Sequence, residues 1–189
     1  MKLLNLTGLA LSFAFVAISA NMKAQQDGIS DNHNITITIP SVAILDIEPS
    51  ASKNILMGFT APTEAGLPIT ATGTNNTLWL NYSSIKTATV TTRHISVKLD
   101  TVIQGVDIKV TAAAPVGGAG ALGTPTSTLT LTAADQSLIS GIGSAYTEDG
   151  SGKGHNLTYT ISPGATTAYG NLTASTTEIA KVTYTFVDN

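Results

Sequence analysis

Three histidines are the side chains best suited to acid–base or metal chemistry in this 189-residue chain. His33, His94 and His155 lie far apart in the sequence and follow no spacing typical of a metal site. The chain has no cysteine, so it offers no thiolate ligand, no disulfide and no cysteine nucleophile. We therefore expect no metal site, and we expect His94 to be a surface residue on a strand beside Arg93.

Two glycine-rich stretches come close to nucleotide-binding or catalytic motifs without matching them. In 150–154 (GSGKG), Thr147 stands where a phosphate-binding loop has its first glycine, and no Ser or Thr follows the lysine. In 141–145 (GIGSA) the serine follows a glycine directly, whereas a nucleophile elbow needs Gly-x-Ser-x-Gly before a helix. We expect neither a nucleotide cofactor nor a catalytic serine.

Acidic residues could supply a glycosidase pair or bind calcium. Glu148 and Asp149 offer oxygen ligands, but the sequence around them is not an EF-hand loop. No spacing brings together two of the remaining candidates for an acid–base pair. These candidates are Asp46, Glu48, Asp100, Asp107 and Asp135. The sequence therefore names no catalytic residue, and we predict a protein that is not an enzyme, with an exported hydrolase as the weakest alternative.

Two features point to sugars. Trp79 and Tyr82 could stack on a glycan, so a secreted carbohydrate-binding module is the main alternative function. They are three residues apart and should face opposite sides of a strand, and we expect Trp79 in the core. Asp100-Thr101-Val102 is similar to the Asp-Ser/Thr-aliphatic site that Bacteroidota glycosylate after export, which makes Thr101 a candidate for O-glycosylation.

Charge is scarce in the chain and slightly acidic. There are 9 Lys and Arg residues against 12 Asp and Glu, and Arg93 is the single arginine. This balance excludes an electrostatic nucleic-acid binder, which needs a basic face. Hydrophobic residues make up 42% of the chain, which argues against disorder, and the length fits one domain.

The N-terminus has the pattern of a secretory signal peptide. Lys2 precedes an apolar run at 9–18 that is too short to span a bilayer and ends in small residues. Cleavage could follow Ser19 or Ala24, and we favour Ala24, which assigns 1–24 to the signal and 25–189 to a single domain. An uncleaved anchor is the alternative. We expect a secreted or cell-surface protein, in the periplasm or on the outer surface of a Gram-negative cell, with no membrane span in the mature chain.

Period-two alternation of apolar and polar residues dominates the rest of the sequence. In 179–187, Val182, Tyr184 and Phe186 share one face and threonines occupy the other. Threonine is one residue in six of the chain and suits the solvent face of a strand. Such short strands, with no helical crossovers, indicate an antiparallel immunoglobulin-like β-sandwich of about 8–10 strands. The predicted strands are 34–39, 42–47, 54–59, 77–82, 94–99, 106–111, 128–132, 157–161 and 179–187.

Two segments interrupt this pattern, and one short helical turn is conceivable. Residues 112–126 are rich in Gly, Ala and Pro and lack charge, so we expect a long loop. Residues 147–155 are polar and glycine-rich and should form a loop or hairpin tip. Thr132 to Asp135 match a capping box that could open one turn through 136–138.

In its signal peptide, its threonine-rich strands, its lack of cysteine and its alternating terminal segments, the chain resembles secreted bacterial β-sandwiches of the fimbrial-subunit or spore-coat-U-like kind, a type typical of Bacteroidota. Subunits of chaperone–usher pili carry a glycine and a penultimate tyrosine near the C-terminus, whereas this chain ends in Val187-Asp188-Asn189. The resemblance implies exchange of a terminal strand, either 34–39 or 179–187.

These features predict an exported, non-enzymatic appendage subunit, coat component or adhesin that acts through pairing or packing of edge strands. Its partners would be itself, other surface proteins or glycans. Low charge at the terminal strands favours such pairing, because charged residues normally protect sheet edges. The side chains expected at the exchanged or edge strands are Ile35, Ile37, Ile39, Val182, Tyr184 and Phe186.

Overall fold

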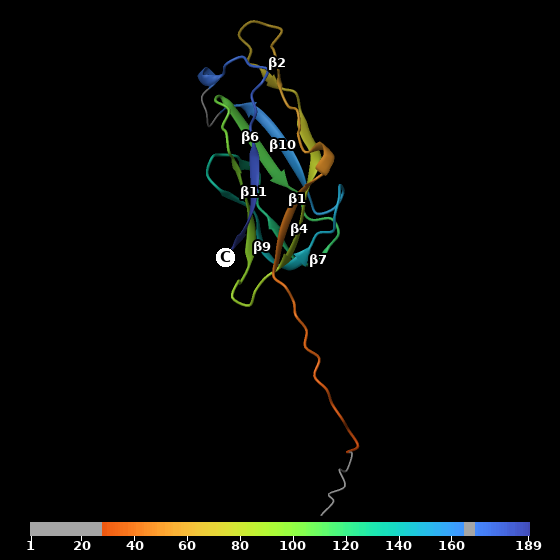
Figure 1. The fold of residues 1–189 in the computed structure, drawn as a ribbon. Helices are drawn as coiled ribbons and strands as arrows, with labels where there is room; N and C mark the ends of the chain where they lie inside the picture. The colour runs from red at the N-terminus through yellow and green to blue at the C-terminus, as the bar shows by residue number, and fades with distance from the viewer. Residues whose placement is uncertain (1–27, 165–168) are drawn as a thin grey trace, which may run out of the picture. The chain divides into compact units, whose positions relative to one another are not determined.

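A computed structural model of the chain describes residues 28–164 and 169–189, so the expected signal peptide at 1–24 lies outside the described residues. The chain divides into two units, Met1–Thr38 and Ile39–Asn189, and every described strand belongs to the second. No α-helix occurs in the described part, which has only the 3-10 turns η1 (Ser50–Ser52) and η2 (Tyr169–Asn171) (Figure 1). The predicted all-β, antiparallel sandwich is confirmed.

The first layer of the sandwich is built around the long strand β4. Each of its members pairs antiparallel with the next, in the order β1, β4, β10, β6, β8. Leu78, Leu80 and Tyr82 of β4 point inward and are buried, while the residues between them face outward. The strands are β1 (Val42–Glu48), β4 (Thr74–Ile85), β10 (His155–Pro163), β6 (Val106–Ala112) and β8 (Leu129–Thr130).

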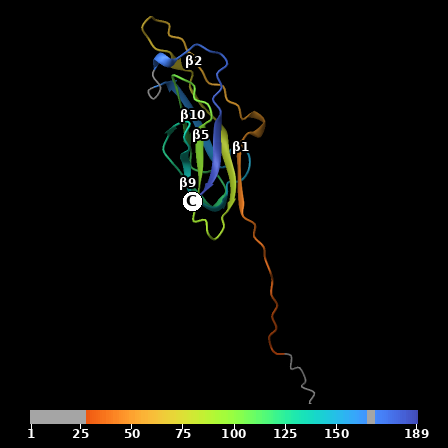
Figure 2. The same cartoon turned by 60° about the vertical axis from the view of Figure 1, so that its left-hand side comes forward.

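The second layer has the order β11, β5, β9, β7 and continues from the first (Figures 1 and 2). The layers join where β4 pairs with β9 at Ser83↔Tyr146 and Ser84↔Ala145, giving one nine-stranded sheet. A separate two-stranded sheet consists of β2 (Phe59–Thr60) and β3 (Thr70–Ala71). The strands of the second layer are β11 (Val182–Asp188), β5 (Arg93–Leu99), β9 (Gln136–Tyr146) and β7 (Ala119–Pro125).

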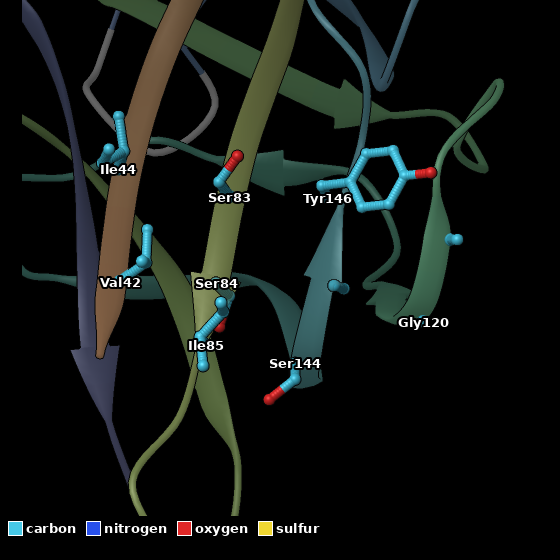
Figure 3. Close-up of a pocket in the computed structure, with 10 residues that line it drawn as sticks. Val42, Ile44, Ser83, Ser84, Ile85, Gly120, Ser144 and Tyr146 are labelled. Atoms are coloured by element: carbon cyan, nitrogen blue, oxygen red, sulfur yellow. The ribbon is translucent and has the colours of Figure 1, made fainter. Parts of the chain in front are cut away.

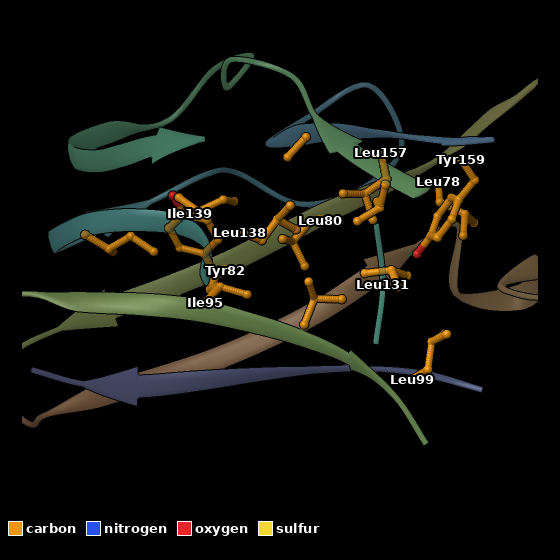
Figure 4. Close-up of a cluster of buried hydrophobic side chains, with 14 residues drawn as sticks. Leu78, Leu80, Tyr82, Ile95, Leu99, Leu131, Leu138, Ile139, Leu157 and Tyr159 are labelled. Carbon is orange, nitrogen blue, oxygen red and sulfur yellow. The ribbon is translucent and has the colours of Figure 1, made fainter. Parts of the chain in front are cut away.

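One hydrophobic core fills the space between the layers (Figure 4). Leu80 of β4, Leu157 of β10, Ile95 of β5 and Ile142 of β9 are all 0% exposed. A hydrogen bond between the hydroxyls of Tyr159 and Tyr184 also joins β10 to β11 across the core. Because both layers contribute to one cluster, the sandwich needs no disulfide to hold its layers together.

Several segments differ from the sequence expectation. Of the predicted strand 54–59, only Phe59 lies in a strand, β2. The predicted loop 112–126 contains β7, because glycines allow its backbone to lie against β9: a Cβ at Gly120 would stand 2.2 Å from the Ser144 carbonyl oxygen. The predicted helical turn through 136–138 is wrong, since these residues begin β9. The Thr132 carbonyl accepts a hydrogen bond from the Leu99 amide, and this tertiary contact takes the place of a helix start.

Candidate functional site

The N-terminal segment 34–39 alternates apolar and polar residues, and all of its apolar side chains are exposed. Ile35, Ile37 and Ile39 are 75%, 76% and 72% exposed, and the segment belongs to no strand. The prediction of a strand here is therefore wrong for the single chain, because a strand needs a hydrogen-bonding partner and the described residues supply none. Burial of one such side chain contributes about 1.5–3 kcal/mol of favourable free energy, so a partner that buries the three isoleucines would bind the segment favourably.

Two strands leave one side unpaired at the same margin of the sandwich. In the described part of the chain, β11 pairs only with β5, and β1 pairs only with β4. The two strands also contact each other. Most of the core residues that are only partly buried lie on or near these strands: Leu45, Ile47, Ile55, Met57, Ala180, Val182, Tyr184 and Phe186. We call this margin the β1–β11 seam.

Arg93, the single arginine, lies inside the seam and is 3% exposed. Its Nε donates to Asp188 Oδ1 on β11 at 2.5 Å, and its Nη1 donates to the Val42 carbonyl on β1. The guanidinium also bonds Ser84 Oγ at 3.2 Å and stands 5.8 Å from the centre of the Phe186 ring. Arg93 therefore ties its own strand β5 to β1, β4 and β11, a role that its sequence context of alternating polar residues did not reveal.

The three histidines differ in their surroundings. His33 is exposed, and His94 is half-buried on β5, 2.7 Å from Asn189 Oδ1. Within 28–164 and 169–189, no group of three or more His, Asp or Glu residues could hold a metal ion. In the same ranges, no helix is long and apolar enough to cross a membrane.

His155 is completely buried, which the sequence did not indicate. Its Nδ1 lies 2.8 Å from the Ala113 carbonyl oxygen and its Nε2 lies 3.1 Å from the Tyr82 hydroxyl. Burial lowers the pKa of His155 because the charged imidazolium loses its hydration. Burial likewise raises the pKa of Tyr82, and both side chains therefore act as neutral parts of the core.

The two aromatic residues proposed for glycan contact lie on opposite faces of β4, as their spacing requires. Tyr82 is 3% exposed and donates its hydroxyl hydrogen bond to the Leu122 carbonyl, so it presents no ring face to a ligand. Trp79 faces outward between Glu48 of β1 and Asn156 of β10 and is half-buried. The expectation that Trp79 belongs to the core is wrong, because Leu78 and Leu80 occupy the inward positions on either side of it.

Thr101, the candidate for O-glycosylation, is exposed on a bend that follows β5. Its neighbour Val102 packs against the core, while Asp100 accepts hydrogen bonds from Lys181 and Thr183. The lysine contact lowers the pKa of Asp100. The triplet is thus held in place at its two flanking residues, while Thr101 between them is exposed.

Three carboxylates from two elements line one surface pocket: Asp46 of β1, and Glu148 and Asp149 of the loop 147–154. Lys53 ion-pairs with Asp46 at 2.8 Å, and Lys153 ion-pairs with Glu148. These hydrogen bonds lower the pKa of both carboxyls. A glycosidase needs one carboxylic acid with a raised pKa as proton donor, so Asp46 and Glu148 are suited to accept hydrogen bonds and not to donate a proton.

No protein-family model, no curated protein and no solved structure matches this chain. The features of the chain that bear on its function are therefore the exposed segment 34–39, the β1–β11 seam and the outward face of the sheet.

Proposed function

We propose that this chain is an exported, non-enzymatic surface protein, an appendage subunit, coat component or adhesin, that assembles by strand pairing. In this proposal the segment 34–39 of one copy adds to the unpaired edge of β11 in another copy or in a related surface protein. The observation that carries the proposal is the exposure of Ile35, Ile37 and Ile39 on an alternating segment that forms no strand.

The edge of β11 is the least protected edge of the sandwich. From Val182 to Val187 it carries no charge and no proline, and the charge of Asp188 at its end is paired with Arg93. By contrast, β1 carries Asp46 and Glu48, β7 ends at Pro125, and β8 has only two residues. Charge, proline and short length are the means by which natural proteins block unwanted strand addition, so β11 is the edge most open to it.

The side-chain pattern of the two segments also matches. Ile35, Ile37 and Ile39 alternate with Thr36 and Thr38. On β11 the inward residues are apolar and alternate with Thr183 and Thr185. A strand added beside β11 would place its isoleucines against the β1–β11 seam, whose core residues are only partly buried, and its threonines in solvent.

Export is part of the same proposal. The N-terminal pattern of a charged start, a short apolar run and small residues supports secretion.

The test compares residues 25–189 with residues 41–189 by size-exclusion chromatography with light scattering and by negative-stain microscopy. We expect concentration-dependent oligomers from the longer chain and a folded monomer from the shorter one. A strict monomer from 25–189 at high concentration would overturn the proposal, as would equal oligomers from both chains.

A further inference from the structure

A groove lies on the outward face of the sheet. The proposed strand addition would place its isoleucines on the inward side of the seam, so the groove takes no part in it. Its larger section is an open depression of about 510 Å³ that runs across β1, β4, β9 and β7 (Figure 3). A second section of about 220 Å³ shares Ile44, Ser83 and Tyr146 with the first and continues toward the loop 147–154. We call the two sections together the Tyr146 groove.

Tyr146 stands where the two sections meet. It pairs with Ser83 of β4 and with Ala119 of β7, so its position is fixed by strands on both sides. The residue is nevertheless 52% exposed, and its ring stacks on no other aromatic ring of the described residues. Gly120 and Ser144 also line the larger section, and the Tyr146 ring points to the side of Gly120, away from Ile44 and Ser83 (Figure 3).

The two sections differ in chemistry. The larger one is mainly apolar, with Val42, Ile44 and Ile85 alongside the tyrosine. The smaller one is lined by the carboxylates of Asp46 and Glu148, each held by a lysine, together with Asp149. The groove thus offers an aromatic face, an apolar floor, and acceptors and donors of hydrogen bonds at one end.

The loop that carries the polar end is anchored in the sheet. Asn81, which is 4% exposed, donates to the Lys153 carbonyl at 2.6 Å and accepts from the Gly150 amide at 2.9 Å. Thr147 is fully buried and its hydroxyl accepts from the Tyr82 amide at 2.8 Å. Glu148 also accepts from the Gly118 amide at 3.2 Å. Its carboxylate is therefore held in position before any ligand arrives, which reduces the entropy lost on binding.

We infer that the Tyr146 groove binds a neutral oligosaccharide. A sugar ring has an apolar face that can stack on tyrosine and hydroxyls that both donate and accept hydrogen bonds. Two of the three carboxylates are already neutralised by Lys53 and Lys153, so the site has little net charge to attract a basic peptide. Binding sites for small ligands typically combine such an apolar lining with a few fixed polar groups.

The experiment titrates residues 25–189 with neutral tetrasaccharides, namely cello-, malto-, xylo- and chitotetraose, by calorimetry and saturation-transfer NMR. We expect at least one to bind with a Kd on the order of 10 μM to 1 mM, and Tyr146→Ala to weaken that binding about tenfold or more. Tyr146→Phe should retain it. Tyr169→Ala, which removes a tyrosine of similar exposure outside the groove, is the matched control and should bind like the unmodified chain.

Three results would overturn the inference: no tetrasaccharide binds, Tyr146→Ala binds as well as the unmodified chain, or hexalysine binds more tightly than every sugar. Tyr146→Ala should unfold at the same temperature as the unmodified chain because the ring is exposed on the outward face. Ile37→Asp should leave sugar binding unchanged, so that failure of the groove and failure of strand assembly are distinguishable.

Discussion

The segment 34–39 and the strand β11 have the same sequence pattern and different structures. Both alternate isoleucine, valine or aromatic residues with threonine. In β11 the apolar residues pack against the core and the backbone pairs with β5 from Val182 to Asp188. In 34–39 the isoleucines are exposed and the backbone belongs to no strand.

Alternation of apolar and polar residues therefore indicates the capacity of a segment to pair as a strand, but does not specify its partner. For β11 the partner lies in the same chain, where Arg93 and the Tyr159 hydroxyl also hold it. For 34–39 we propose that the partner lies in another molecule.

The largest effect is expected from a charge in the exposed segment. Ile37→Asp should weaken assembly of residues 25–189 about a thousandfold, because strand addition would bury an unpaired carboxylate, at a cost of about 3–5 kcal/mol. Sedimentation velocity over a range of concentrations measures this change. Thr36→Asp is the matched control, since its side chain would face solvent in the added strand, and it should assemble nearly as well as the unmodified chain. Equal loss in both variants would contradict pairing in this orientation.

The second effect compares how much β11 and the segment 34–39 contribute to the stability of the folded monomer. Phe186→Ala should lower the free energy of unfolding by about 3 kcal/mol, because its ring meets Tyr82 edge-on at 5.7 Å and packs on the core. Ile37→Ala should change that free energy by less than about 0.5 kcal/mol. Urea denaturation at protein concentrations below assembly gives both values. A comparable loss in Ile37→Ala would place the segment within the monomer's own core.

A smaller effect is expected at the contact that fastens β11 to the seam. Asp188→Ala should lower the free energy of unfolding by about 1–2 kcal/mol, because it removes a charge-assisted hydrogen bond from a buried arginine that keeps its other partners. Thermal and urea unfolding test this. Asp149→Ala, which removes an exposed carboxylate elsewhere, is the control and should change stability by less than about 0.5 kcal/mol.

The smallest effect is the pH dependence of stability that the buried His155 causes. The pKa of His155 is lowered in the folded state, so the unfolded chain binds a proton near pH 6.5 while the folded chain does not. Stability should therefore be level above that pH and fall below it, by no more than about 1.4 kcal/mol per pH unit for one proton. The carboxyls with lowered pKa, such as Asp46, lose their contribution only at more acidic pH. Urea denaturation between about pH 8 and 5.5 should show this slope in the unmodified chain and lose it in His155→Gln.

Much of the fold could be predicted from the sequence, because strands with one face in the core alternate apolar and polar residues. The predicted segments 42–47, 77–82, 94–99 and 106–111 correspond to β1, β4, β5 and β6. Strands β7 and β9 were missed because glycines break their pattern, and Gly120 and Gly123 of β7 are needed where its backbone lies close to that of β9. Propensity alone does not reveal such an approach.

The candidate sites were less predictable, since each depends on contacts between distant residues. The three isoleucines of 34–39 could be named from their spacing, but their exposure could not. Arg93 and His155 look like ordinary polar residues until the fold buries them. Tyr146 could not be selected from sequence either, because the groove around it requires four strands from distant parts of the chain.

Disulfide trapping tests strand addition at β11 most directly, and the absence of cysteine from the chain gives it a clean background. One variant carries Thr36→Cys, the other Thr185→Cys, and the two are mixed and oxidised. A disulfide forms only when Cα atoms come within about 4.4–6.8 Å, as across neighbouring strands. Strand addition at β11 predicts a covalent heterodimer in high yield. The yield of heterodimer from Thr36→Cys mixed with Thr87→Cys should be far lower. Equal yields from the two mixtures, or no heterodimer at all, would contradict it.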